Sequence, residues 1–285
     1  MIHLENVSFG YKRRRKLFDG LDMELESGGI YGLLGRNGAG KSSLLRIIHG
    51  LLYPWSGKVD VLGFTPKRRS AELFSDIYMI AEEQHIPNMK IRTFMQTYAS
   101  FYPKFSEQQF LNLLEEFELD KTGHMRELSW GQKKKVLLSF GLATNSRILL
   151  MDEPTNGLDI PSKSQFRQLL SSAITPDRTF IISSHQIRDL HSLLDTIVIL
   201  EKGKIIFHES LGSILDTLNF QVVYHPPKDG ETLYYERIPG GYMTVQPQDE
   251  NEESLEVDIE ILFNAIISNP GTFAHLFKKR SVHAN

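Results

Sequence analysis

The sequence predicts an α/β protein with a mostly parallel sheet, and three observations support this prediction. Short stretches that are apolar throughout recur along the chain, which is typical of strands buried on both faces. Helical patterns lie between several of these stretches, as the crossover connections of a parallel sheet require. The chain has 285 residues, of which 41% are hydrophobic and 24% charged, enough for one large domain or two unequal ones.

The N-terminal part predicts strands and a helix in an order that matters for chemistry. A buried strand at residues 29–35 ends in a glycine-rich turn, and apolar residues at helical spacing follow directly. The stretch WSGKVDVLGF, residues 55–64, is interpreted as a hairpin with its turn at Ser56-Gly57. Two further strands are expected at residues 2–9 and 21–25.

From about residue 91 to residue 143 the pattern becomes helical. Ser106 and Gln109 fit the S-x-x-Q spacing of a capping box, which predicts a helix that begins there. We therefore expect a helical subdomain over about 88–143, inserted into the sheet domain. Strands return at residues 147–151, 178–184, 196–200 and 204–208.

The composition changes again after about residue 210. A helical stretch at 211–218 leads to β-like segments, and an acidic stretch precedes an apolar helix at 259–268. These patterns predict a small α+β appendage. We expect the chain to divide into residues 1–208 and 209–285.

Charge and composition exclude several classes of function. The formal net charge of −3 requires no anionic partner, and we expect no nucleic-acid partner. The absence of cysteine excludes disulfides and thiolate metal sites. No apolar run approaches the roughly 20 residues of a membrane helix, so any membrane role is expected to come through a partner.

The stretch GRNGAGKS, residues 35–42, is the strongest chemical signal. It fits G-x-x-x-x-G-K-[ST] and lies between a strand and a helix, the context that this motif requires. Its glycines let backbone N–H groups turn inward toward phosphate, and the helix N-terminus adds a positive dipole end. Lys41 then supplies charge to the β- and γ-phosphates, and Ser42 a hydroxyl for Mg²⁺. The alternative is a chance glycine-rich turn, which the context disfavours.

Two adjacent carboxylates follow the apolar strand in RILLMDEP, residues 147–154. Asp152 fits the acidic residue that holds Mg²⁺ through water, and Glu153 fits a general base for the attacking water. Because successive strand side chains point in opposite directions, the two can act separately only if the strand ends there. An acidic strand end in a solvated loop is the alternative.

His185 follows the apolar strand RTFIISS. The carboxyl end of a strand is where open α/β sheets bind ligands, so this histidine is a candidate partner of the γ-phosphate or the water. A surface histidine is the alternative.

These features together resemble the nucleotide-binding subunit of an ABC transporter. The carriers are GRNGAGKS, LSWGQ, RILLMDEPTNGLD and SSH, in that order, and the resemblance covers about residues 1–208. The stretches FYPKFSEQQFLNLLEEFEL and SLEVDIEILFNAII resemble the ABC-2 branch of bacterial drug, antibiotic or lantibiotic exporters. The resemblance implies a P-loop NTPase (RecA-like) core with an antiparallel β subdomain, a helical subdomain and the small appendage.

The resemblance also implies how such a subunit works. Two subunits, identical or different, meet head to tail and sandwich two ATP molecules with Mg²⁺, while a transmembrane permease forms the substrate path. The protein is then cytoplasmic and peripheral, held at the inner face of the cell membrane through its partner. Glu153, His185 and Lys41 are the implied catalytic residues, and Ser42, Asp152 and Glu82 the implied metal residues. The implied ATP-binding residues are Tyr11, Gly35, Arg36, Asn37, Gly38, Ala39, Gly40, Lys41, Ser42, Ser43, Ser129, Gly131, Gln132 and Asp159.

Individual roles follow the family pattern. Tyr11 is implied to stack on adenine, with an ordinary strand-end tyrosine as the alternative. The loop Asn156 to Asp159 is implied to cross the dimer interface, and His185 to act as the switch histidine. Ser129 and the backbone at Gly131 are implied to reach the γ-phosphate of the nucleotide held by the other subunit.

Two positions depart from that pattern. The family places a glutamine where IYMIAEEQ puts Glu82, and Gln84 comes two residues later, so either the loop is shifted or a carboxylate replaces the amide. Trp130 stands where glycine is commonest, and we expect its indole at the rim of the dimer interface, with core packing as the alternative. Lys133 to Lys135 are interpreted as a solvated helix face.

Other classes of protein fit less well. A soluble ABC-type ATPase is the main alternative to a transporter subunit. A small-molecule kinase lacks the LSWGQ stretch and the switch histidine, and a non-hydrolysing ATP sensor does not need the Asp152-Glu153 pair.

Overall fold

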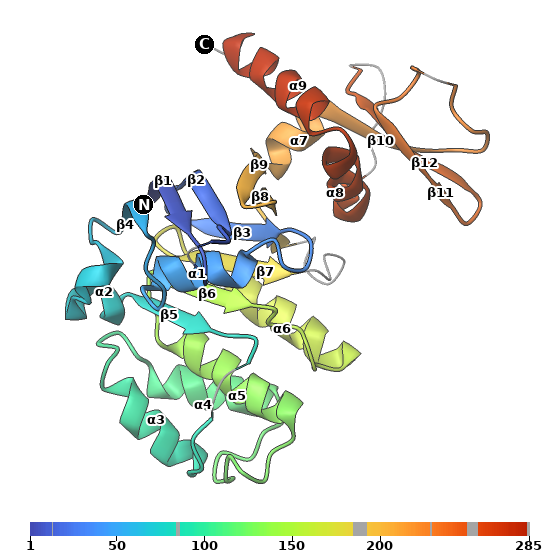
Figure 1. The fold of residues 1–285 in the computed structure, drawn as a ribbon. Coiled ribbons are helices and arrows are strands. Elements are labelled where there is room, and N and C mark those ends of the chain that lie inside the picture. Colours follow the sequence, from blue (N-terminus) through green and yellow to red (C-terminus); the bar gives the residue numbers. More distant parts are fainter. Residues whose placement is uncertain (13, 84–85, 185–192, 229, 250–255, 284–285) are drawn as a thin grey trace.

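The computed structural model describes residues 1–12, 14–83, 86–184, 193–228, 230–249 and 256–283, and its central feature is a mixed sheet (Figure 1). Every neighbouring pair in this sheet is parallel except the last, which confirms the predicted mostly parallel sheet. Its six strands lie in the order β5 (Ile77–Ile80), β6 (Ile148–Asp152), β7 (Thr179–Ser184), β3 (Gly29–Leu34), β8 (Thr196–Glu201) and β9 (Lys204–Ser210).

Both faces of the central sheet are covered, and the alternation within one strand shows how. Ile148 and Leu150 of β6 belong to one hydrophobic core, whereas Leu149 and Met151 belong to the other. A strand buried on both faces needs apolar side chains at every position, which explains the uninterrupted apolar runs. The core with Ile148 and Leu150 includes helix α1 (Lys41–His49). The core with Leu149 and Met151 includes α4 (Glu107–Glu116), α5 (Trp130–Ala143) and α6 (Ile160–Ala173).

A separate antiparallel sheet covers α1 on the N-terminal side. It has the order β2 (Phe18–Leu25), β1 (Ile2–Phe9) and β4 (Ser56–Val61). The predicted turn at Ser56-Gly57 is wrong, because both residues belong to β4. Gly57 has φ +91° and an added Cβ would lie 2.4 Å from the carbonyl oxygen of Asn6, so this glycine serves a bulge against β1. The chain turns at Leu62 and Gly63, which both have positive φ.

The predicted helical region lies beyond the β5 edge of the central sheet (Figure 1). It contains α3 (Ile91–Ala99) together with α4 and α5. Short helices α2 (Ala71–Ser75) and η1 (Pro66–Arg68) precede it. The Ser106 hydroxyl accepts a hydrogen bond from the backbone N–H of Gln109, as a capping box requires. The side-chain oxygen Oε1 of Gln109, however, accepts from Asn145 and not from the backbone N–H of Ser106. Ser106 is therefore an N-cap that lacks the reciprocal bond.

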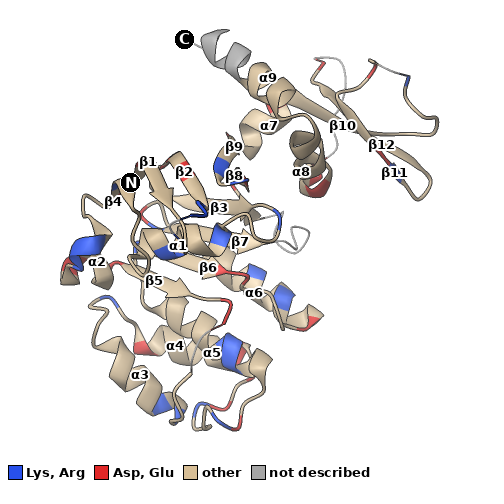
Figure 2. Ribbon diagram, in the orientation of Figure 1, with Lys and Arg blue, Asp and Glu red and all other residues tan. Residues whose placement is uncertain are grey.

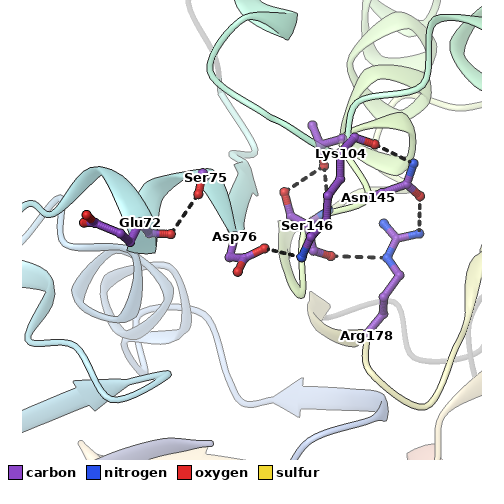
Figure 3. Close-up of polar contacts among 8 residues, drawn as sticks. Glu72, Ser75, Asp76, Lys104, Asn145, Ser146 and Arg178 are labelled. Atoms are coloured by element: carbon purple, nitrogen blue, oxygen red, sulfur yellow. Dashed lines mark hydrogen bonds and ion pairs between the residues drawn. The ribbon is translucent and has the colours of Figure 1, made fainter.

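A polar cluster fastens this helical region to the start of the sheet strands (Figure 3). Lys104 forms an ion pair with Asp76, at 2.8 Å, and its backbone carbonyl accepts from Asn145. The buried guanidinium of Arg178 donates to the carbonyl oxygens of Ser146 at 3.2 Å, Leu142 at 3.2 Å and Ala173 at 3.1 Å. These bonds join the chain segments that enter β5, β6 and β7, at the end of the sheet opposite the glycine-rich loop.

The C-terminal residues form a further sheet and helices beyond the β9 edge (Figure 1). The T-shaped contact between Phe207 and Phe277, with ring centroids 5.2 Å apart, joins them to β9. No helix among the described residues is long and apolar enough to cross a membrane. Strand β12 and helix α9 were not predicted from the sequence. The elements are α7 (Leu211–Thr217), β10 (Leu218–Val223), β11 (Tyr234–Ile238), β12 (Gly241–Pro247), α8 (Ile259–Ser268) and α9 (Pro270–His283).

Candidate nucleotide site

The glycine-rich loop joins β3 to α1 and has the backbone shape that its glycines allow. Gly38 has φ +80° and Gly40 has φ +111°, conformations that favour glycine. Gly40 is also the N-cap of α1, and no side chain caps this helix end. The first backbone N–H groups of α1 are therefore left for a ligand, as an anion site at a helix N-terminus requires.

Lys41 is held inside this loop. Its Nζ donates to the carbonyl oxygen of Gly35 at 2.8 Å, and the residue is 7% exposed. Burial lowers the pKa of the Lys41 ammonium, while the nearby carboxylates of Glu153, Asp152 and Glu82 act to raise it. The ammonium thus lies near the carboxylates that were predicted from the sequence as catalytic and metal-binding residues.

The two adjacent carboxylates separate at the end of β6, as predicted. The strand ends at Asp152, and Glu153 adopts φ +47°, a left-handed conformation that few non-glycine residues adopt. Both side chains are buried. The hydroxyl of Ser184 donates to Glu153 Oε2 at 3.3 Å, whereas Asp152 interacts with Ser42 and Ser183.

Asp152 and Ser42 fit a divalent cation. The Ser42 hydroxyl donates to Asp152 Oδ1 at 3.0 Å, and Asp152 Oδ2 is buried without a hydrogen-bond partner. No group of three or more His, Asp or Glu side chains among the described residues could hold a metal by itself. Mg²⁺ is commonly held by one or two protein oxygens together with substrate phosphates, so a site that is incomplete without nucleotide fits this ion.

A cavity of about 660 Å³ opens over the loop. Three basic residues of the segment before β2 line it: Lys12, Arg15 and Lys16. Their position directly after Tyr11 was the signal that could have found them. The other lining residues are Tyr11, Leu17, Asn37, Gly38, Gly40, Lys41, Ser42, Ser43, Glu82 and Glu153.

Tyr11 lies at the mouth of this cavity. Its ring is 64% exposed, and its edge contacts Phe9 with ring centroids 5.3 Å apart. Its hydroxyl lies 2.9 Å from the Ser43 hydroxyl. An exposed ring beside the phosphate loop leaves a face available for a flat ligand.

Glu82 also lines the cavity, so a carboxylate lies at the site near the position where the family places a glutamine. The side-chain amide of Asn156 donates to Glu82 Oε1 at 3.1 Å. Gln84 and His185 lie outside the described residues.

The LSWGQ stretch forms the start of α5. Ser129 and Gln132 make a complete capping box: the Gln132 N–H donates to the Ser129 hydroxyl at 3.2 Å, and the Ser129 N–H donates to Gln132 Oε1 at 2.9 Å. None of Ser129, Gly131 and Gln132 is among the residues that line the cavity. A Cβ on Gly131 would lie 2.8 Å from the carbonyl oxygen of Gly157, so this glycine is required inside its own subunit.

Trp130 lies at the surface of its own subunit, which contradicts the core-packing alternative, and its expected place at the rim of a dimer interface stays a prediction. It is 50% exposed, so it is not a core residue. Its six-membered ring covers Gly157, where an added Cβ would lie 2.5 Å from a ring carbon. The indole therefore packs on the loop that follows the carboxylates.

Lys134 contradicts the interpretation of Lys133 to Lys135 as a solvated face. The residue is 3% exposed and its Nζ donates to the carbonyl oxygen of Ala81 at 3.3 Å. The hydrophobic periodicity of the sequence could not show which of these lysines is buried, because three successive residues of the helix are all basic. Figure 2 shows basic ribbon on α5 and acidic ribbon beyond the ends of β5 and β6.

Asp159 is the N-cap of α6. Its Oδ1 accepts the Ser162 N–H at 3.0 Å, and the hydrogen bonds from Ser162 lower the pKa of this carboxyl. It does not line the cavity. The structure thus brings together the loop residues, Tyr11, Glu82, Asp152 and Glu153, and it places Asp159 with the LSWGQ residues elsewhere.

Comparison with known proteins identifies the family. A family model described as ABC transporter matches residues 18–156. The chain is 32% identical to the putative ABC transporter ATP-binding protein AlbC of Bacillus subtilis, over 72% of this chain and 90% of AlbC. The chain belongs to the ABC transporter family, as an ATP-binding subunit. The resemblance seen in the sequence and the expectation of an ATP-hydrolysing subunit of a transporter are confirmed at this level.

Other similar proteins are named for different transport roles. The chain is 35% identical to the methionine import ATP-binding protein MetN of Carboxydothermus hydrogenoformans, over 72% of this chain but 65% of MetN. It is 30% identical to YtrB of Bacillus subtilis, over 72% of this chain and 70% of YtrB. A solved ATP-binding subunit of an ABC transporter has the same fold, with a TM-score of 0.67, 22% identity and coverage of 75% and 91%.

Proposed function

We propose that this ABC ATPase subunit belongs to an exporter of the ABC-2 type and powers it by closing on a second ATP-binding subunit. The export direction is supported by the helical-region and C-terminal stretches quoted above. A Nod factor export ATP-binding protein from Neorhizobium galegae, 28% identical, is among the similar proteins. The transmembrane permease would receive the motion and form the substrate path at the inner face of the cell membrane.

One observation supports the shared-site mechanism above the others. The cavity gathers Lys41, Ser42 and Glu153 around a loop shaped for phosphate, yet Ser129 and Gly131 lie outside it. If these two contact nucleotide, the nucleotide belongs to another subunit. Closure of a dimer would then complete two sites at once, so hydrolysis would report on the closed state.

Each group in the cavity has a proposed role. Lys41 would hold the β- and γ-phosphates, Ser42 and Asp152 would hold Mg²⁺, and Mg²⁺ would neutralise phosphate charge. Glu153 would accept the proton of the attacking water, since its side chain is separated from Asp152 by the turn at the strand end. Tyr11 would stack on adenine.

The proposed division of the chain is an ATPase domain at 1–208 and an appendage at 209–285. Strand β9 ends at Ser210, two residues beyond this boundary, and the following sheet pairs only its own strands among the described residues. The family model ends at residue 156, so it does not bear on the appendage.

The test is Glu153→Gln in the full chain, with size-exclusion chromatography in ATP and Mg²⁺. We expect this variant to bind ATP, to elute as a dimer and to lose hydrolysis by a factor of about 10² or more, because the base is lost while the binding groups remain. The wild-type chain without nucleotide is the control and should elute as a monomer. A variant that binds ATP but stays monomeric would contradict the shared site.

The permease partner needs a separate test. Affinity purification of the chain from detergent-solubilised membranes of its own source organism should recover one membrane protein in a stoichiometric amount. Recovery of none under conditions that preserve the ATP-bound dimer would favour a soluble ABC-type ATPase instead.

A further inference from the structure

Lys134 is a buried cation on α5 that lies beside the nucleotide site. Its residue is 3% exposed, and its Nζ bonds to the carbonyl oxygen of Ala81 and lies 5.5 Å from the centre of the Trp130 ring. Burial lowers the pKa of this ammonium to about 8, and the carboxylates of Asp152 and Glu82 are the largest opposing influences. A buried ammonium needs compensating negative charge, and these carboxylates supply it.

Lys134 offsets part of the negative charge of the buried carboxylates at the site. Three carboxylates, on Glu82, Asp152 and Glu153, face the ammonium of Lys41, which all three influence. With Lys41 alone these groups carry a net charge of −2, and Lys134 reduces it to −1. Lys134 is influenced by the same three carboxylates and is the second cation.

Asp152 and Glu82 are the carboxylates that influence Lys134 most, and Glu82 belongs to the segment that Lys134 contacts. The ammonium bonds to the backbone carbonyl of Ala81, the residue before Glu82, so it also fixes the segment that carries this carboxylate. The Glu82 side chain accepts a hydrogen bond from Asn156, whose amide is neutral. The charge of Glu82 is therefore compensated by the two buried ammonium groups that it influences, Lys41 and Lys134.

We propose that Lys134 is a positioning residue that balances the negative charge of Glu82 and holds its segment at the nucleotide site. This inference rests on the proposed nucleotide site. Removal of Lys134 alone leaves excess negative charge, which repels metal-free ATP and attracts Mg²⁺. Removal of Glu82 alone has the opposite effect, and removal of both restores the net charge.

The experiment compares Lys134→Met, Glu82→Gln and the double variant in the full chain. ATP binding is measured by calorimetry in EDTA, and the Mg²⁺ concentration for half-maximal ATP binding is measured separately. We expect Lys134→Met to weaken metal-free ATP binding about tenfold, and Glu82→Gln to strengthen it severalfold, as a unit charge a few ångströms away would do. The double variant should return to within about threefold of the wild type.

Thermal unfolding without nucleotide or metal gives a second readout that does not depend on activity. Because Lys134→Met leaves Glu82 uncompensated, it should lower Tm more in the wild-type background than in the Glu82→Gln background. Lys134→Arg, which keeps the charge, should preserve metal-free ATP binding. Lys133→Met is the matched control, since it removes the same charge from the next, half-buried position and should show no coupling to Glu82.

The outcomes separate two failures. A wild-type chain that binds no ATP would overturn the proposed nucleotide site itself. Two results in a wild-type chain that binds ATP would overturn the charge balance alone. One is that Lys134→Met and Glu82→Gln change metal-free affinity in the same direction. The other is that Lys134→Met lowers Tm equally in both backgrounds.

Discussion

His49, at the C-terminal end of α1, provides a pH test of the packing behind the phosphate loop. Its ring packs against Phe74, with centroids 5.5 Å apart, and its Nδ1 is buried without a hydrogen-bond partner. Burial lowers the pKa of His49 to about 4, and the positive charge of Arg69 acts in the same direction. A helix C-terminus favours a cation by about 1 kcal/mol, but here desolvation outweighs it.

The sign and the magnitude follow from linkage. The unfolded His49 has a pKa near 6.5, so the neutral ring contributes full stability above pH 6.5 and loses it as the pH falls toward 4. A difference of roughly 2.5 units corresponds to about 3 kcal/mol in the free energy of unfolding, as an upper value for a group that is not fully buried.

The assay is urea unfolding followed by circular dichroism at several pH values between 7 and 4.5. His49→Leu should remove part of the acid-dependent loss of stability and should change stability little at pH 7, because an apolar side chain suits the site. His225→Leu, at an exposed histidine, is the control and should keep the wild-type pH dependence. Parallel stability curves for the wild type and His49→Leu over this pH range would refute the reasoning.

Two further substitutions test the nucleotide cavity and the polar cluster. Tyr11→Phe removes the contact with the Ser43 hydroxyl but keeps the ring, so ATP affinity measured by fluorescence titration should stay within about threefold, whereas Tyr11→Ala should lower it about tenfold through lost stacking. Equal losses in both variants would assign the role to the hydroxyl. Arg178→Met should lower the free energy of unfolding by about 3 kcal/mol in urea titrations, since three carbonyl oxygens lose a donor, and a change below about 1 kcal/mol would show that they find other partners.

The sequence predicted those parts of the site whose geometry is set by residues adjacent in the chain. The glycine-rich loop and the pair at Asp152 and Glu153 each depend on one strand end and one turn. Both features can be predicted from a short stretch of sequence. Gly57 shows the limit of this approach, because a glycine marks a turn and a bulge equally well until its strand partner is known. Lys134 was misread for the same reason: a charged residue shows its environment only when the packed elements are in place.

Trp130 and Lys134 also change what the LSWGQ stretch means within one subunit. Trp130 covers Gly157 in the loop after the carboxylates, and Lys134 donates to Ala81, the residue before Glu82. Asn156, in the same loop as Gly157, donates to the side chain of Glu82. The start of α5 therefore forms a closed set of contacts with both segments. Because packed contacts of this kind move together, a shift of α5 has to be shared by the loop and by Glu82. In the proposed shared site, a nucleotide that touches α5 from a second subunit would act on the carboxylates of the first subunit through these contacts.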